Sequence, residues 1–170
     1  IPYFLTANHC AFDAGDDVVF WFDWYRTTCN SGSTLTTPQT ISGSTVIASR
    51  SESDFLLLEL SSAPVDDPTH PFVYAGVDYS GATPERTMGI HHPSGDVKKV
   101  STDLDQPIQS GYYSSGTTHW QVVDWDTGTT EGGSSGSPLF DPAGNIIGQL
   151  HGGDAACGND FEDYYGRTSV

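Results

Sequence analysis

The stretch EGGSSGSPLF, residues 131–140, carries the strongest local signal in this chain. Gly133 and Gly136 enclose two serines, and glycine permits tight backbone turns that strain other residues. The segment therefore predicts a sharp turn that presents Ser135, followed by a short strand. A loop rich in glycine and serine is, taken alone, more often a flexible linker, so this interpretation depends on what the rest of the chain supplies.

Two further segments supply groups that can act together with a serine. LTANHC places His9 directly before Cys10, and SDFLLLEL places Asp54 before an apolar run. Each residue alone is more often structural, but with Ser135 they give the order His, Asp, Ser, which resembles the chymotrypsin-like serine proteases. Subtilisins run Asp-His-Ser and α/β-hydrolases run Ser-Asp-His. The hydrolase motif G-x-S-x-G also needs glycine where this chain has Ser137.

These residue types suit acyl transfer. A serine hydroxyl is a weak nucleophile at neutral pH, so His9 would take its proton during attack and later pass it to the leaving amine. Asp54 would fix the imidazole tautomer and stabilise the imidazolium. The N–H groups of Gly133 and Ser135 would form an oxyanion hole, and losing one such donor typically lowers turnover about 100-fold or more.

Composition excludes several classes of function. The net charge of −16 arises from 22 acidic and 6 basic residues, which argues against nucleic acid or an anionic membrane as a partner and favours cationic substrates. The longest apolar run, Phe55–Leu58, is strand-sized and predicts no membrane span. The 19 glycines and 10 prolines are typical of an all-β protein with many turns.

Short apolar segments between turn clusters predict strands. The polar stretch Thr27–Gly43 separates the first two, and Asp141–Gly144 predicts a hairpin turn between the last two. Ser61–Pro71, with three prolines, is linker-like. The chain also begins, at Ile1, inside a strand. The other predicted strands are Asp17–Trp24, Ser44–Ala48, Phe55–Leu60, Thr87–His92, Val97–Leu104, Thr118–Trp125, Ser137–Phe140 and Asn145–His151.

The resemblance to chymotrypsin-like proteases implies two six-stranded antiparallel Greek-key β-barrels. Residues 1–70 would be the remainder of the N-terminal barrel, with His9 and Asp54, and residues 71–170 the C-terminal barrel, with Ser135 and the specificity pocket. That fold has several strands before its histidine, whereas eight residues precede His9 here. We therefore expect a fragment whose N-terminal barrel is incomplete and which is truncated at both ends.

A closer resemblance is to the bacterial lysyl endopeptidases. It rests on TTEGGSSGSPLFDPAGNIIGQLHGGDAAC, SDFLLLEL, GIHHPSGDVKKVS and GTTHW, which are spread over nearly the whole chain. It implies a secreted, extracellular, monomeric endopeptidase without cofactor or metal. Such an enzyme would cut protein or peptide substrates after lysine through an acyl-enzyme, with His9, Asp54 and Ser135 as the triad.

The same resemblance implies the substrate-binding residues. Leu150–Gly153 would be an edge strand that pairs with the substrate backbone, through His151, Gly152 and Gly153. His151 would stack on an aromatic ring where the family has tryptophan, and this chain offers Tyr112 or Tyr113.

Selectivity for lysine would rest on Asp163, in EDYYGR, at the floor of the pocket. An unpaired buried carboxylate there would favour a basic side chain. The alternative is that Asp163 is simply one of 22 acidic residues. Lysine occurs only at Lys98 and Lys99, as self-preservation from a lysine-specific protease predicts, although a salt-adapted surface explains it equally.

Three cysteines, Cys10, Cys29 and Cys157, are an odd number without a C-x-x-C pair, which argues against structural zinc. By the resemblance, each would form a disulfide bond with a segment outside this chain.

Two further features of the sequence concern metal binding and activation. His91-His92 resembles a metal pair, but neighbours on a strand face opposite sides, so a structural role is expected. Ser134 stands where chymotrypsin-type zymogens use aspartate to pair with a new N-terminus, so that activation switch is missing.

Two rival functions remain open. A glutamyl endopeptidase shares the acidic character and this style of serine loop, but Asp163 would repel a glutamate side chain. A protease-like binding module without activity is the second, and the complete triad argues against it.

Overall fold

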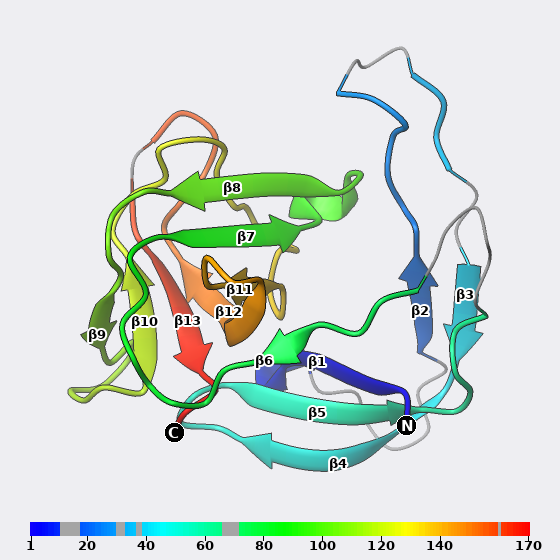
Figure 1. The fold of residues 1–170 in the computed structure, drawn as a ribbon, viewed down its shortest axis with the longest axis horizontal. Helices are drawn as coiled ribbons and strands as arrows, with labels where there is room; N and C mark the ends of the chain where they lie inside the picture. The colour runs from blue at the N-terminus through cyan, green and yellow to red at the C-terminus, as the bar shows by residue number, and fades with distance from the viewer. Residues whose placement is uncertain (11–17, 30–32, 37–38, 66–71, 160) are drawn as a thin grey trace.

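A computed structural model describes residues 1–10, 18–29, 33–36, 39–65, 72–159 and 161–170, and its elements are β-strands and two short 3₁₀ turns (Figure 1). Among these residues, no helix is long and apolar enough to cross a membrane. In chain order the elements are β1 Tyr3–Ala7, η1 Asn8–Cys10, β2 Val19–Phe22, β3 Gln39–Ser42, β4 Ser44–Arg50, β5 Phe55–Leu60, β6 Gly76–Val77, β7 Thr87–His91, η2 Pro93–Gly95, β8 Lys99–Asp103, β9 Ile108–Ser110, β10 His119–Val122, β11 Pro138–Phe140, β12 Asn145–Gly153 and β13 Asp163–Arg167.

The N-terminal half is built on β5. Its residues alternate between buried and half-buried, so that Leu56, Leu58 and Leu60 point to one face. Strands β1 and β4 pair antiparallel with its two edges. The separate hairpin-like pair β2–β3 adds Phe20 and Ile41 to the same apolar cluster. Burial of this cluster is what fixes the register of β5, because a shift by one residue would expose all three leucines.

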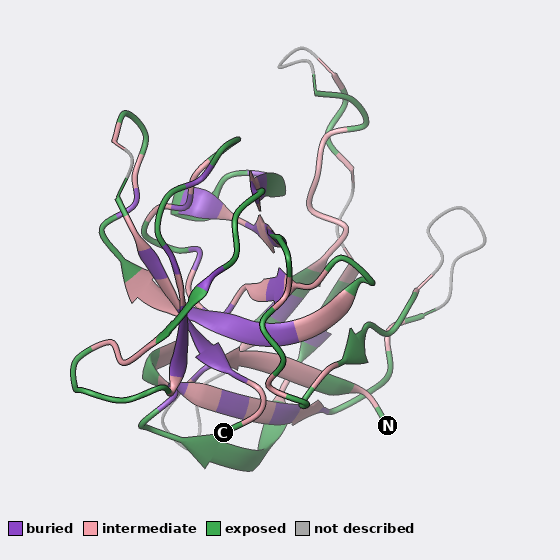
Figure 2. Ribbon diagram, turned by 60° about the vertical axis from the view of Figure 1, so that its left-hand side comes forward, coloured by how far each residue is buried: buried purple, intermediate pink, exposed green. Residues whose placement is uncertain are grey.

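The C-terminal half forms one larger sheet. In the described residues it has eight strands, in the order β8-β7-β11-β12-β13-β10-β9, with β6 beside β12 as a parallel neighbour. Figure 2 shows buried positions in the strands of both halves of the molecule. The core side chains are Trp120, Val122, Trp125, Leu139, Ile147, Leu150, Ala155 and Tyr165.

The two expected six-stranded barrels differ from this arrangement. The C-terminal sheet is larger than six strands and does not close, because its edge strands β8 and β9 do not pair with each other. The described N-terminal strands form a sheet of three and a pair of two instead of one barrel. The architecture is nevertheless all-β with mostly antiparallel pairing, as predicted.

Most predicted strands are present within a few residues of their predicted ends. Four are missed: β3, within the predicted polar stretch, the two-residue strand β6, β9 and β13. The turn at Asp141 is confirmed, because its carbonyl accepts the Gly144 N–H at 3.0 Å and its Oδ1 accepts the Ala143 N–H at 2.8 Å. Asp17 and the predicted boundary at residues 70 and 71 lie outside the described residues.

A hydrogen bond and close backbone packing join the two halves beside Asp54. Gln149 Nε2, on β12, donates to the buried Ser53 carbonyl at 2.7 Å. Gly166, on β13, packs against the same carbonyl, and a Cβ there would collide with it. On the other side, Gly136 packs against Thr6 and Ala7 of β1. These contacts set the residue before Asp54 against the strands that follow Ser135.

Candidate active site

His9 and Asp54 form a hydrogen-bonded pair. His9 lies in η1, directly after β1, and Asp54 directly precedes β5, and the antiparallel pairing of Ala7 with Phe55 brings them together. His9 Nδ1 lies 2.6 Å from Asp54 Oδ2, and the His9 backbone N–H donates to Asp54 Oδ1 at 2.7 Å. The carboxylate is buried and the imidazole is exposed, so the free Nε2 of His9 is available to a substrate.

Asp54 adopts an unusual backbone conformation, with φ of +57°. A left-handed conformation costs a residue with a side chain about 1–3 kcal/mol, although aspartate tolerates it better than most. It lets the Asp54 carbonyl accept the Asn8 N–H at 2.7 Å while both carboxylate oxygens face His9. The strained turn therefore presents three acceptors to the segment that carries the histidine.

The loop that carries Ser135 has the predicted tight turns. Gly133 and Gly136 have φ of +94° and +80°, which supports the argument from their lack of a side chain. The Ser134, Gly136 and Ser137 amides all donate to backbone carbonyls. Within the described part of the chain, the Gly133 and Ser135 amides donate to no other group, so both remain available to an oxyanion.

Neighbouring residues link the Ser135 loop to the segment that carries His9. Gly136 donates to the Leu150 carbonyl at 2.8 Å, and Leu150 directly precedes His151, whose ring stacks on His9 with centroids 5.8 Å apart. Gly136 also packs against β1, which leads into His9. No hydrogen bond joins Ser135 and His9, both of which the structure describes. Catalytic contacts are often long in unliganded enzymes and tighten with substrate.

His151 lies at a β-bulge. The register of β12 with β13 shifts between Leu150 and Gly152, and the extra residue is His151. A bulge re-aims a side chain, and here it turns His151 Nε2 to within 3.8 Å of Asp54 Oδ2. Burial lowers the pKa of His151 although Asp54 raises it.

The predicted edge strand needs a correction. On one side of Leu150, its N–H donates to the Ser137 carbonyl and its own carbonyl accepts the Gly136 N–H. Strand β13 pairs with the other side of β12. Strand β12 lies inside the sheet because β11 covers it up to Gln149. His151–Gly153 extend beyond β11, so only they remain for backbone pairing on that side among the described strands.

Sequence reasoning missed His119. This residue is 1% exposed, and its Nε2 lies 2.9 Å from His151 Nδ1 while its Nδ1 lies 2.8 Å from Thr118 Oγ1. Burial and the neighbouring His151 lower the pKa of His119 to about 4, so it is neutral at neutral pH. The signal available in the sequence was the histidine of GTTHW at the start of a predicted strand.

Tyr112 and Tyr113 both contact His151, but edge-on instead of stacked. Their centroids lie 4.9 and 5.5 Å from the imidazole, with interplanar angles of 77° in each case. Tyr112 stacks on Tyr164 of β13 instead, at 4.5 Å and 21°. The expected stack is replaced because Tyr164 occupies the face of Tyr112.

Asp163 is 1% exposed at the start of β13. Its Oδ2 accepts hydrogen bonds from Trp125 Nε1 at 2.8 Å and Thr130 Oγ1 at 2.7 Å, so the carboxylate is buried as predicted but not unpaired. Its Oδ1 faces Gly153, where a Cβ would collide with it. Burial raises the pKa of Asp163, and the two donors lower it.

One group of side chains has donors suited to a metal. Ligand atoms of His9, Asp54 and His151 lie within 4.8 Å of one another. Ligands of one tetrahedral Zn²⁺ stand roughly 3.3 Å apart at ordinary bond lengths. Asp54 Oδ2 and His9 Nδ1, at 2.6 Å, are closer than that, so the spacing is that of an acid–base pair.

The adjacent histidines make separate contacts, and only His91 lies in strand β7. His91 is buried among serine hydroxyls, and His92 Nδ1 contacts the Asp96 carbonyl at 3.1 Å. The thiols of Cys10, Cys29 and Cys157 are free.

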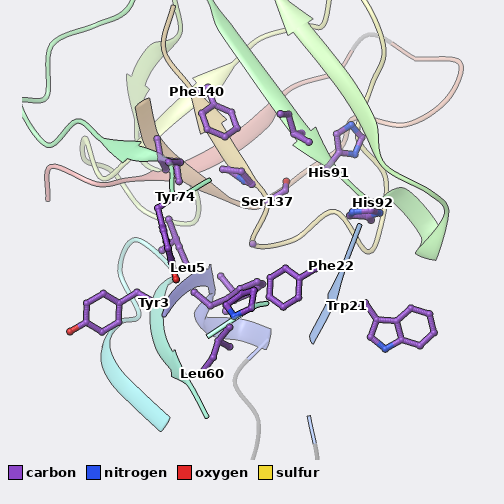
Figure 3. Close-up of a pocket in the computed structure, with 18 of the residues that line it drawn as sticks. Tyr3, Leu5, Trp21, Phe22, Leu60, Tyr74, His91, His92, Ser137 and Phe140 are labelled. Carbon is purple, nitrogen blue, oxygen red and sulfur yellow. The ribbon is translucent and has the colours of Figure 1, made fainter. Parts of the chain in front are cut away.

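A cavity of about 440 Å³ lies between the two halves. Figure 3 shows Leu5, Phe22 and Leu60 of the N-terminal half on one side, and Ser137, Phe140 and the two histidines on the other. The loop from Gly133 to Pro138 also lines it. His9, Asp54 and His151 do not line this cavity, so it is separate from the acid–base pair.

Comparison with known proteins identifies a family for this chain. The model of the family described as lysyl endopeptidase, C-terminal domain, matches residues 1–166. The lysyl endopeptidase of Pseudomonas aeruginosa is 35% identical over 188 residues, covering 98% of this chain. The chain spans 38% of the length of that relative.

Solved structures share the fold at low identity. The HtrA-type protease AlgW superposes with a TM-score of 0.63 at 20% identity, covering 98% of this chain and 45% of that one. The MamO protease domain of Magnetospirillum magneticum gives 0.62 at 14% identity, covering 99% and 80%. These likenesses show a trypsin-like protease fold, and the family match shows more: the chain belongs to the lysyl endopeptidase family.

Proposed function

We propose that this chain carries the catalytic residues of a serine endopeptidase that cleaves after lysine. The observation that carries the proposal is the 2.6 Å contact between His9 Nδ1 and Asp54 Oδ2. The Ser135 loop supports it, because its Gly133 and Ser135 amides donate no hydrogen bond to any described residue. Family membership supports the same activity.

The reaction begins at the exposed nitrogen of the imidazole. Because Asp54 accepts a hydrogen bond from Nδ1–H, the lone pair of the neutral His9 ring lies on Nε2. Nε2 accepts the Ser135 proton as Ser135 Oγ attacks the carbonyl carbon of the substrate. The amides of Gly133 and Ser135 stabilise the resulting oxyanion. The imidazolium then protonates the leaving amine, and the acyl-enzyme forms.

Water completes the cycle. It attacks the acyl-enzyme, gives its proton to His9 Nε2, and the tetrahedral intermediate collapses to release the carboxylic acid and restore the Ser135 hydroxyl. Asp54 keeps its charge throughout and stabilises each imidazolium through the same short contact.

Lysine selectivity is assigned to Asp163. The two hydrogen-bond donors on Oδ2 stabilise the charged form of Asp163 despite its burial. Oδ1 lies beside Gly153, and the side chain of any other residue at position 153 would collide with it. A lysine ammonium that reaches Oδ1 would exchange water for a charge-assisted contact. A glutamate side chain would be repelled, which disfavours the glutamyl endopeptidase alternative.

The test uses the complete protein and fluorogenic peptides that differ only in the residue before the scissile bond. Lysine should be cleaved fastest, arginine more slowly and glutamate not measurably. Asp163→Asn should remove most of the preference for lysine over norleucine while hydrolysis of an uncharged ester persists. Equal turnover of lysine and glutamate peptides, or full activity of Ser135→Ala, would contradict the proposal.

A further inference from the structure

The serine loop is held by the segment His91–Gly95. His91 Nδ1 lies 2.9 Å from Ser134 Oγ, and Ser134 directly precedes Ser135. The other ring nitrogen, Nε2, lies 3.0 Å from Ser101 Oγ on β8. Ser101 in turn donates to the Thr129 carbonyl at 3.1 Å. His91 is 1% exposed, so this chain of hydrogen bonds is shielded from water.

The donor and the acceptor of each hydrogen bond in this series follow from the carbonyl group at its end. A carbonyl can only accept, so the Ser101 proton is used on Thr129, and His91 must donate its Nε2–H to Ser101 Oγ. Neutral imidazole then has a lone pair on Nδ1, which accepts the Ser134 O–H. The Glu131 N–H donates to Ser134 Oγ at 3.4 Å and completes the set.

A second set of contacts acts on the same loop. The Ser94 N–H donates to the Gly132 carbonyl at 2.7 Å, and Ser94 Oγ donates to Glu131 Oε2 at 3.1 Å. Ser94 adopts a left-handed φ of +52° to do so. A Cβ on Gly133 would stand 3.2 Å from the Ser94 nitrogen, so the two backbones pack closely. The segment therefore contacts each residue from Glu131 to Ser134.

We propose that neutral His91 is a positioning residue, which holds Ser134 and thereby orients the Gly133 and Ser135 amides for the oxyanion. The proposal rests on the proposed function. It accounts for Ser134, because an uncharged hydroxyl on a buried neutral imidazole needs no charged N-terminus to hold the loop. Addition of a second proton to His91 would turn Nδ1 into a donor, so the Ser134 O–H could no longer donate to it and would have to rotate toward another acceptor.

The surroundings of His91 keep it neutral. Burial lowers its pKa to about 4, with the adjacent His92 and with Lys99 on β8 adding to the effect. Lys99 is itself paired with Asp96 at 3.1 Å. Glu131 is the charged group of the loop, and it is bonded to Ser94 and to the Cys157 N–H.

The test separates the two nitrogens of His91 in the complete protein. His91→Asn can still offer an acceptor to Ser134, His91→Gln can reach Ser101, and His91→Leu offers neither. We expect His91→Leu to lower kcat about 10- to 100-fold with little change in KM, because displacing amides costs less than deleting one. Asn should restore more of kcat than Gln. Val100→Ala, at an exposed position of the neighbouring strand β8, is the control and should leave kcat unchanged.

Equal kcat for His91→Leu and the wild type, or better rescue by Gln than by Asn, would overturn the proposal. ¹⁵N NMR of the unmodified protein gives a readout that does not need a foldable variant. It should show His91 as the Nε2–H tautomer, with Nδ1 shifted in Ser134→Ala, and an Nδ1–H tautomer would also overturn the proposal. The expected tautomer in a protein without hydrolytic activity would count against the proposed function alone.

Discussion

Asp54 combines a strained backbone with three acceptor roles, and each role constrains its replacement. Its carbonyl and Oδ1 bind the backbone of the segment that contains His9, while Oδ2 binds the ring. Removal of the side chain would therefore disturb both the position and the tautomer of the imidazole, whereas asparagine can preserve the position.

Asp54→Asn isolates the tautomer. With the amide oxygen accepting the His9 backbone N–H, its NH₂ group faces Nδ1 and forces the ring proton onto Nε2, which then cannot accept from Ser135. We expect kcat to fall about 10,000-fold with the fold retained. Steady-state kinetics with circular dichroism as the control would check this, and a loss under tenfold would argue against the assigned role.

At the scale of elements, the site depends on irregularities that interrupt regular strands. The bulge at His151 and the glycines that admit close backbone approach place side chains where a regular strand would not. The continuous apolar run that begins at Phe55 predicted β5, because such a run is a local pattern. Strand β3, with the sequence QTIS, was missed because its polar residues give no such pattern.

Partners distant in sequence could not be predicted in the same way. Ser135, His9 and Asp54 could be predicted as a triad because each has a recognisable local setting. The contacts of His119 with His151 and of His91 with Ser134 join residues 32 and 43 positions apart, and nothing in either segment specifies the other. Burial, which decides whether a histidine is neutral, is likewise a property of the assembled sheet.

The junction of the halves gives a prediction at this scale. In Gly166→Ala the new Cβ would collide with the Ser53 carbonyl and push the halves apart. We expect the free energy of unfolding to fall by about 1–3 kcal/mol, measured by urea denaturation. Gly132→Ala, where a Cβ would meet no atom within 4 Å, is the matched control. Equal loss in both variants would contradict the account of this junction.

At the scale of the whole molecule, stability should depend on pH through buried histidines. The pKa of His119 is lowered from 6.5 to about 4, so the unfolded chain binds more protons than the folded one between these values. Its stabilising contribution is complete above pH 6.5 and is lost as pH falls toward 4.

The variant His119→Gln isolates this effect from the protonation of carboxylates. The stability advantage of the wild type over the variant, measured by urea denaturation at high salt, should shrink as pH is lowered from 7 to 4.5. An advantage that is constant or grows over that range would show that His119 is not held neutral by the fold.

The assignment of Ser135 is tested most directly by covalent labelling. The complete protein is treated with a fluorophosphonate, which reacts with activated serines, and the modified residue is located by peptide mass spectrometry. The account predicts a single adduct on Ser135, abolished in His9→Ala and retained in Asp163→Asn. An adduct on another serine, or none in a correctly folded protein, would contradict it.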